Sequence, residues 1–139
     1  MPSPTLTTLQ EKCQNIIDGG ADAFRWVWDE QYDSVLSTLK GAGTAVARPL
    51  MEQNFTTTWD FQSIETAPET TRRVAALLGG LSAGQALFIT NPDADVIMVG
   101  LWWPWRDGDS VSVRIGLVAM DESLDQKEID KALKGWFGW

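Results

Sequence analysis

The segment 95–105 constrains the fold more than any other part of the chain, because it is apolar on both sides of an extended strand. Successive side chains of a strand point to opposite faces of a sheet. One face therefore carries Ile97, Val99, Leu101, Trp103 and Trp105, and the other carries Val96, Met98, Trp102 and Pro104. Both faces need a cover, so we expect a sheet with packing partners on each side.

Three other segments have strand patterns. Residues 55–61 alternate aromatic and polar side chains, 85–90 are short and apolar, and 110–120 alternate apolar with polar residues. The Asp107-Gly108 pair between the last two strands is typical of a hairpin turn. We therefore predict a mainly antiparallel sheet of four strands.

The cover of this sheet is expected to be incomplete in one place. Ser112 and Arg114 make the second face of the last strand polar near the hairpin tip. We expect one face of the sheet to take the helices that follow the first and last strands. The other face would take the N-terminal helices or a second chain.

Four helices are expected around the sheet. Their predicted ranges are 3–19, 22–40, 67–81 and a C-terminal helix capped by Ser123. The second has an apolar stripe that includes Phe24, Tyr32 and Leu39. Residues 44–54 are left open between helix and loop, because Pro49 disfavours a long helix.

The chain is thus predicted to be a single α+β domain over residues 1–139, in the order α-α-β-α-β-β-β-α. Its last part resembles the sheet-plus-helix arrangement of profilin-like and Roadblock-like domains, and two helices before a sheet resemble the NTF2-like fold. Both likenesses are of element order alone, so we assign the chain to no family.

The composition argues against several functional classes. The 139 residues contain no histidine and one cysteine, which argues against histidine-based catalysis, a zinc site and an internal disulfide. We expect Cys13 to be a core residue, because it lies in the apolar stripe of the first helix. The net charge of −8 disfavours binding to nucleic acid or to an anionic membrane. Without a leader-like N-terminus or a long apolar run, the cytoplasm is the default location.

The sequence predicts neither a cofactor nor a metal ion. The acidic residues 93, 95, 107 and 109 lie in turns at opposite ends of a meander, so we interpret them as turn formers. Carboxylates alone can perform acid–base chemistry. Asp60 with Glu65, and Asp29 with Asp33, are the pairs to consider, although solvated surface is the better interpretation.

The eight tryptophans are the most informative feature for function. Trp and Arg are enriched at binding hot spots. We therefore take as partner-binding candidates the tip residues Trp102, Trp103, Trp105 and Arg106 and the tail residues Trp136 and Trp139. The alternative, that these rings fill the core, stays open.

The negative charge is concentrated in the first half of the chain. Residues 1–70 contain 10 acidic and 4 basic residues. Asp22, Asp29 and Asp33 would lie close together on the predicted second helix. They are a further candidate for contact with a basic protein partner.

These observations favour a non-enzymatic protein-binding module that neutralises or escorts a cognate partner, as immunity proteins and secretion chaperones do. One alternative is an NTF2-like pocket protein that binds or hydrolyses a small molecule, with a site lined by Trp59, Phe61, Trp103 and Trp105. Another is a structural subunit that forms a homodimer through an uncovered sheet face.

Overall fold

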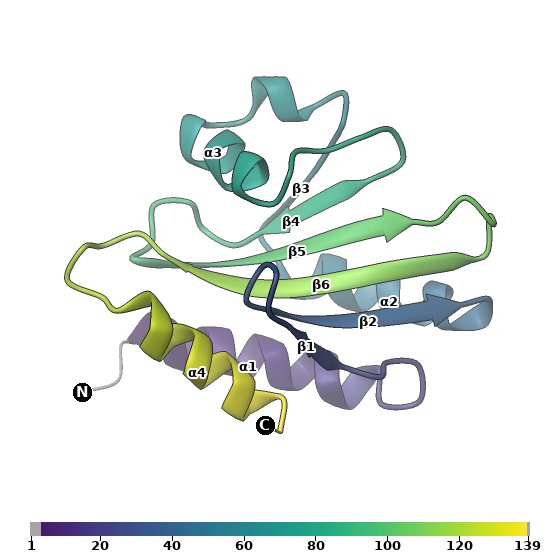
Figure 1. Ribbon diagram of the computed structural model, residues 1–139, viewed down its shortest axis with the longest axis horizontal. Helices are drawn as coiled ribbons and strands as arrows, with labels where there is room; N and C mark the ends of the chain where they lie inside the picture. Colours follow the sequence, from purple (N-terminus) through teal and green to yellow (C-terminus); the bar gives the residue numbers. More distant parts are fainter. Residues whose placement is uncertain (1–3, 139) are drawn as a thin grey trace.

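A computed structural model describes residues 4–138, whose strands form one antiparallel sheet in the order β1-β2-β6-β5-β4-β3 (Figure 1). Every neighbouring pair is antiparallel. The strands are β1 (Val27–Asp29), β2 (Ser34–Lys40), β3 (Thr57–Asp60), β4 (Ala86–Ile89), β5 (Val96–Pro104) and β6 (Ser110–Ala119).

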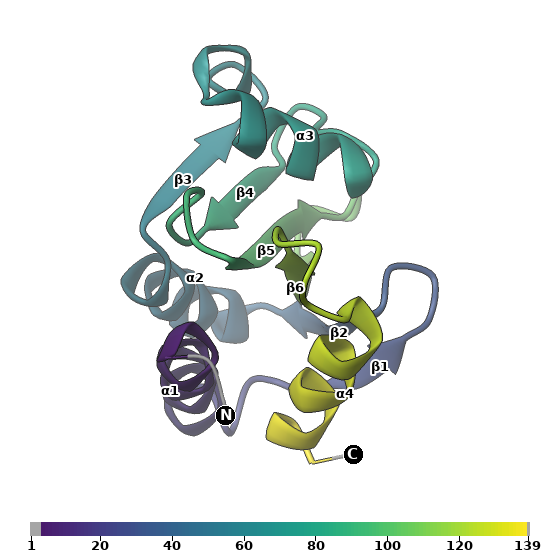
Figure 2. The same cartoon turned by 90° about the vertical axis from the view of Figure 1, so that its left-hand side faces the viewer.

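The helices cover the two faces of the sheet unequally. Three helices lie on one face, namely α1 (Pro4–Gly19), α2 (Ala42–Asn54) and α4 (Gln126–Trp136) (Figure 2). The opposite face carries α3 (Glu69–Leu77) and a short 3-10 helix, η1 (Ile64–Thr66), over the half of the sheet that contains β3, β4 and β5. Among these helices, none has both the length and the apolarity that a bilayer crossing demands.

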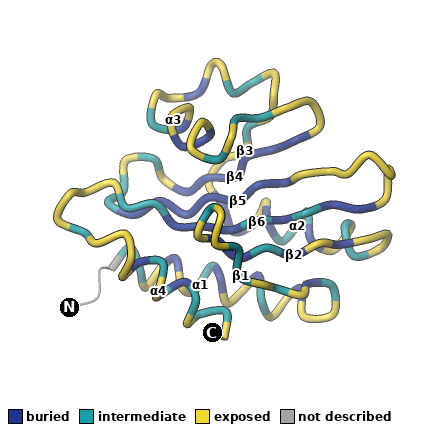
Figure 3. The backbone as a smooth tube through the Cα atoms, in the orientation of Figure 1, coloured by how far each residue is buried: buried dark blue, intermediate teal, exposed yellow. Residues whose placement is uncertain are grey.

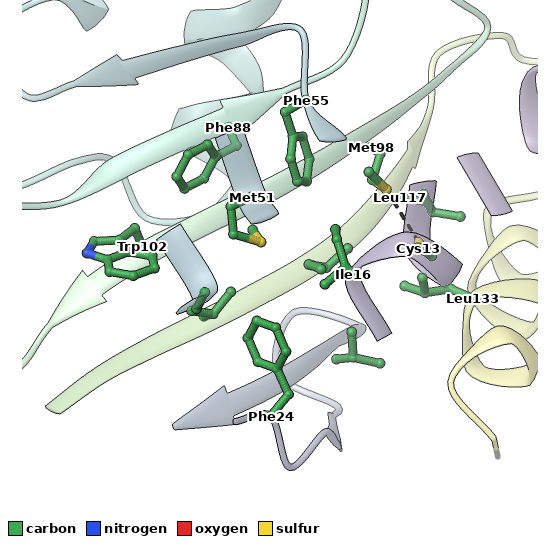
Figure 4. Close-up of a cluster of buried hydrophobic side chains, with 14 of the residues drawn as sticks. Cys13, Ile16, Phe24, Met51, Phe55, Phe88, Met98, Trp102, Leu117 and Leu133 are labelled. Carbon is green, nitrogen blue, oxygen red and sulfur yellow. Dashed lines mark hydrogen bonds between the residues drawn. The ribbon is translucent and has the colours of Figure 1, made fainter. Parts of the chain in front are cut away.

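The strand β5 divides the core into two clusters, as its sequence predicts. Met98 and Trp102 belong to the main cluster under α1, α2 and α4, which Figure 4 shows. Ile97, Val99 and Leu101 belong to a second cluster under α3. The buried stretch of β5 ends near its tip, where the chain becomes exposed (Figure 3).

Cys13 lies in the main cluster, as predicted. Its Sγ atom is 3.5 Å from the Sδ atom of Met98, and the residue is fully buried. Burial raises the pKa of the Cys13 thiol to about 12. The thiol is therefore protonated at neutral pH and contributes to packing.

The predicted helix over 22–40 is wrong, because this segment contains the β1–β2 hairpin. The residues at helical spacing are cross-strand partners, since Val27 pairs with Leu36 and Trp28 with Val35. Aromatic and β-branched residues favour strands. At the turn, Asp33 adopts a left-handed φ of 48°, which a helix does not contain. The sheet consequently has two more strands than predicted. The resemblance to the NTF2-like fold was based on two helices before the sheet, and the second of these is absent.

Residues 44–54, which the sequence left open, belong to α2. Its buried residues Ala47, Met51 and Asn54 follow helical spacing. Pro49 lies inside the helix but is exposed to solvent. Burial of one face of α2 therefore outweighs the loss of the backbone hydrogen bond that Pro49 cannot donate.

The remaining elements confirm the α+β class but not the predicted element order. The strands expected at 85–90, 95–105 and 110–120 form within those limits. The cap of α4 is Asp125, whose side chain accepts a hydrogen bond from the Lys127 N–H, in place of Ser123. The two helices that we expected on one face, α3 and α4, lie on opposite faces.

We predict that Gly100→Ala destabilises the protein and that Gly116→Ala does not. A Cβ atom at 100 would lie 2.6 Å from Met51 Cε and 3.0 Å from Phe55 Cζ, whereas at 116 the nearest atom would be Ser34 Cβ at 3.5 Å. Overpacking should cost about 1–3 kcal/mol of unfolding free energy. Urea denaturation measures both variants, and equal stability of the two would contradict this account of the core.

Candidate functional site

The sheet has a region, here called the open face, that no described element covers. It lies on the α3 side of the sheet, beyond the reach of α3. Trp103 and Trp105 remain 47% and 54% exposed there, and Val27 of β1 remains 54% exposed. A hollow of about 500 Å³ lies on the open face beside the two indoles, lined by Leu36, Trp103, Pro104, Trp105, Arg106, Ser112 and Arg114.

The indole of Trp105 is held in place by hydrogen bonds that cross three strands. Its Nε1–H donates to Ser112 Oγ at 2.8 Å. The same Oγ atom lies 3.2 Å from Thr38 Oγ1, on β2. Trp103 pairs with Ser112 in the β5–β6 register, so both indoles lie in adjoining positions on the face. The Trp105 indole is therefore held in one orientation without a partner.

Arg114 joins the edge hairpin to the centre of the sheet. Its Nη1 atom donates to the carboxylate of Asp29 and, at 2.9 Å, to Ser34 Oγ. The guanidinium carbon lies 4.8 Å from the centroid of the Tyr32 ring. The hydrogen bond from Arg114 is the largest cause that lowers the pKa of Asp29 below its usual range. These contacts fix the β1–β2 hairpin at one end of the open face.

Of the four candidates at the hairpin tip, the structure places three on the open face and one in the core. Trp103, Trp105 and Arg106 are exposed and line the hollow. Trp102 is only 8% exposed, and the guanidinium carbon of Arg48 lies 5.1 Å from its ring centroid. The alternation of side chains along β5 turns Trp102 towards α2, which leaves it unavailable to a partner.

The tail candidates do not join this face. Trp136 is half-buried at the end of α4 and packs against the main core. Trp139 lies outside the described residues. Two tryptophans outside the predicted candidates, Trp26 and Trp28, also pack against the main core, where Lys134 Nζ lies 4.7 Å from the centroid of the Trp28 ring. The open face is therefore a feature of the sheet, distinct from the tail.

The predicted acidic cluster on a helix face is wrong, because the helix is absent. Asp22 lies in the loop that precedes β1, and Asp29 is paired with Arg114. Asp33 lies in the β1–β2 turn. Burial is the largest cause that raises the pKa of Asp130 on α4, and the negative charge of Asp33 also raises it. Asp29 and Asp33 thus flank the same β1–β2 turn, whereas Asp22 lies in the loop before β1.

Asp60, which was considered for acid–base chemistry, and Asp107, which was interpreted as a turn former, both act as structural hydrogen-bond acceptors. Asp60 accepts hydrogen bonds from the backbone N–H groups of Gln62 and Ser63, and the bonds from Ser63 are the main cause that lowers its pKa. Asp107 closes the β5–β6 turn, and its bonds from Ser110 lower its pKa to about 2. No metal-binding group of three or more His, Cys, Asp or Glu residues occurs among residues 4–138.

The four aromatic residues suggested for a small-molecule site lie in three places. Trp59 packs beside the α3 cluster. Phe61 lines a separate hollow with Arg48 and Gln85. Only Trp103 and Trp105 share a hollow. A single cavity lined by all four side chains is therefore not formed.

Comparisons with known proteins do not identify a relative. The chain matches no protein-family model, no curated protein and no solved structure. The function is therefore inferred from the geometry of this molecule.

We predict that alanine substitution of the neighbouring Trp102 and Trp103 lowers the unfolding free energy by very different amounts. Trp102→Ala should lower the unfolding free energy by about 3–5 kcal/mol, because it empties part of the core. Trp103→Ala should lower it by about 1 kcal/mol or less, as for other surface substitutions. Chemical denaturation compares the two, and a larger loss for Trp103→Ala would refute the assignment of faces.

We also predict that Asp29→Asn destabilises the protein in a pH-dependent way. The pKa of Asp29 is lowered in the folded state, so its stabilising effect is present above the unfolded pKa of about 3.9 and is lost as pH falls through the folded value. At pH 7 the loss should be about 1–2 kcal/mol, and it should disappear in acid.

Urea denaturation at several pH values measures this difference. The control is Glu52→Gln, which breaks the exposed pair with Arg48 and should change stability by less than about 0.5 kcal/mol. A constant difference between wild type and Asp29→Asn down to low pH would show that the ion pair is not its cause.

Proposed function

We propose that this protein is a non-enzymatic binding module that recognises a cognate protein partner through the open face. The proposal rests on Trp103 and Trp105, which are half exposed on a part of the sheet that no described element covers. Burying a large aromatic side chain is among the strongest single contributions to an interface.

The chemistry around the two indoles supports a protein partner. Arg106 and Arg114 line the same hollow, and Trp with Arg is the combination enriched at binding hot spots. Ser112 adds a hydroxyl group to the lining of the hollow, 3.2 Å from Thr38 Oγ1 on the neighbouring strand. Apolar anchors beside a few polar groups are typical of the centre of a protein–protein interface.

The order of the open face favours binding without rearrangement. Trp105 is held by Ser112, and Arg114 is held by Asp29 and Ser34. Side chains that are already fixed lose little conformational entropy when a partner docks. The affinity for the partner therefore benefits from a surface that the sheet has preorganised.

Charge determines which partners the module would attract. The net charge of −8 steers basic proteins towards it and repels acidic ones. It also opposes close association of two copies, so a heterologous basic partner is favoured over a homodimer. A small protein that neutralises or escorts a basic cognate protein fits these properties.

A site-specific crosslink in the native host tests this proposal. A photo-reactive amino acid is placed at position 103 and, as a control, at position 46 on α2, where Val46 is exposed on the other side of the sheet. We expect one stoichiometric protein adduct from position 103 and none from position 46.

The captured protein is then purified and titrated calorimetrically. It should bind wild type and Val46→Ser equally, and Trp103→Ser/Trp105→Ser at least about tenfold more weakly. If no adduct forms at position 103, or if the double substitution leaves the affinity unchanged, the proposal fails.

A further inference from the structure

We propose that the hollow of the open face receives an acidic side chain of the partner, flanked by apolar residues, and that Arg106 binds its carboxylate. This inference rests on the proposed function and specifies which part of the partner makes the contact. Its basis is the sign of the charges that line the hollow, the unmatched charge of Arg106, and the two indoles beside that cation.

The charged side chains that line the hollow are all basic. They are Arg106 and Arg114, and the other lining residues are aromatic, aliphatic or hydroxyl-bearing. The helix α3, on the same side of the sheet (Figure 2), adds the exposed Arg72 and Arg73, and its single acidic residue is Glu69. The hollow therefore favours a negatively charged group, although the protein as a whole is acidic.

Arg114 supplies oriented hydrogen-bond donors to the hollow. Its charge is matched by Asp29, and its Nη1 atom donates to Asp29 and Ser34. Its Nε and Nη2 atoms make no hydrogen bond with any other described residue. A guanidinium carries five N–H groups. Arg114 therefore retains donors for a group that enters the hollow, while its position is fixed by the hairpin.

Arg106 has a charge that nothing in the described part of the chain matches. Its side chain is exposed, and its guanidinium makes neither a hydrogen bond nor an ion pair with another described residue. The acidic residues that follow it are directed elsewhere. Asp107 accepts hydrogen bonds from Ser110 within the turn. A Cβ atom on Gly41 would lie 3.9 Å from Asp109 Oδ1, which places that carboxylate beside the end of β2.

The two indoles make the hollow suited to a carboxylate between apolar neighbours. Trp103 and Trp105 line the same hollow as Arg106. Apolar side chains that cover the indoles also remove water from around the guanidinium, and the attraction between opposite charges increases as water is removed. A guanidinium can donate two parallel hydrogen bonds to one carboxylate, and such bonds are stronger than those between neutral groups.

An acidic contact is compatible with a partner that is basic as a whole. The net charge of −8 acts on the entire approaching protein over about 8–10 Å, the range that physiological salt allows. At contact the nearest pair of charges dominates, because Coulomb energy varies inversely with distance. The net charge would thus attract basic proteins in general, and the hollow would select among them the one that presents an acidic side chain.

Three peptides that differ at one position test this inference in a nuclear magnetic resonance titration. Each has the sequence Lys-Leu-X-Leu-Lys with blocked ends, where X is Glu, Gln or Lys. The reporters are the indole N–H signals of Trp103 and Trp105. Attraction by the net charge alone predicts the tightest binding for X = Lys, because that peptide is the most positive. The basic hollow predicts the opposite order, with X = Glu the tightest.

Two protein variants assign the preference to Arg106. Arg106→Gln removes the proposed anchor, and the control Lys131→Gln removes the same charge from the exposed surface of α4, on the other side of the sheet. We expect the Glu peptide to bind wild type and Lys131→Gln equally, at least about tenfold more tightly than the Gln peptide. In Arg106→Gln this preference should disappear. Circular dichroism checks that both variants remain folded.

Three results would overturn the inference. One is tighter binding of the Gln or Lys peptide than of the Glu peptide, or a Glu preference that Arg106→Gln leaves unchanged. Another is the absence of any indole shift with all three peptides at millimolar concentration. The last is a dimer of the unliganded protein in analytical ultracentrifugation that Trp103→Ala/Trp105→Ala dissociates, because a second copy would then occupy the face.

The crosslink from position 103 separates this inference from the proposed function. A protein adduct at position 103 together with no Glu preference refutes the acidic contact and leaves the binding module in place. The absence of an adduct refutes the proposed function itself, whichever peptide binds.

Discussion

The structure depends on the two-sided burial of β5. Its even-numbered side chains, such as Met98 and Trp102, pack under α1, α2 and α4, and its odd-numbered ones, such as Val99 and Leu101, pack under α3. Because α3 is short, this second cover ends before the strand does. Trp103 and Trp105 continue the apolar side of β5 beyond the part that α3 covers. Their indoles are exposed for this reason.

The strand register determines which side chains surround the two exposed indoles. Ser112 and Arg114 of β6 lie opposite Trp103 and Leu101, and Leu36 of β2 lies opposite Arg114. Polar, apolar and aromatic groups thus alternate across three strands. The ion pair of Arg114 with Asp29 holds the outer hairpin against them. The same contacts that stabilise the edge of the sheet therefore order the candidate interface.

Sequence patterns predicted the part of this architecture that depends on local alternation. The strand 95–105, its two faces and the polar side of 110–120 are set by a period of two. They indicated an incomplete cover near the hairpin tip but did not assign it to the α3 side of the sheet, where Trp103 lies. The hairpin at 27–40 was missed because residues 27, 28, 35 and 36 satisfy helical spacing as well as cross-strand pairing. Val27 and Leu36 were lost from the candidate site for that reason. Which face takes α3 and which takes α4 depends on tertiary packing, which no local period encodes.

The central claim is that solvent reaches Trp103 and Trp105 but not Trp102. Nuclear magnetic resonance of the tryptophan ring signals with a soluble paramagnetic reagent measures this directly, residue by residue. The account predicts strong broadening for the rings of Trp103 and Trp105 and sharp signals for Trp102. Equal protection of all three rings would contradict it, since some element or second copy would then cover the open face.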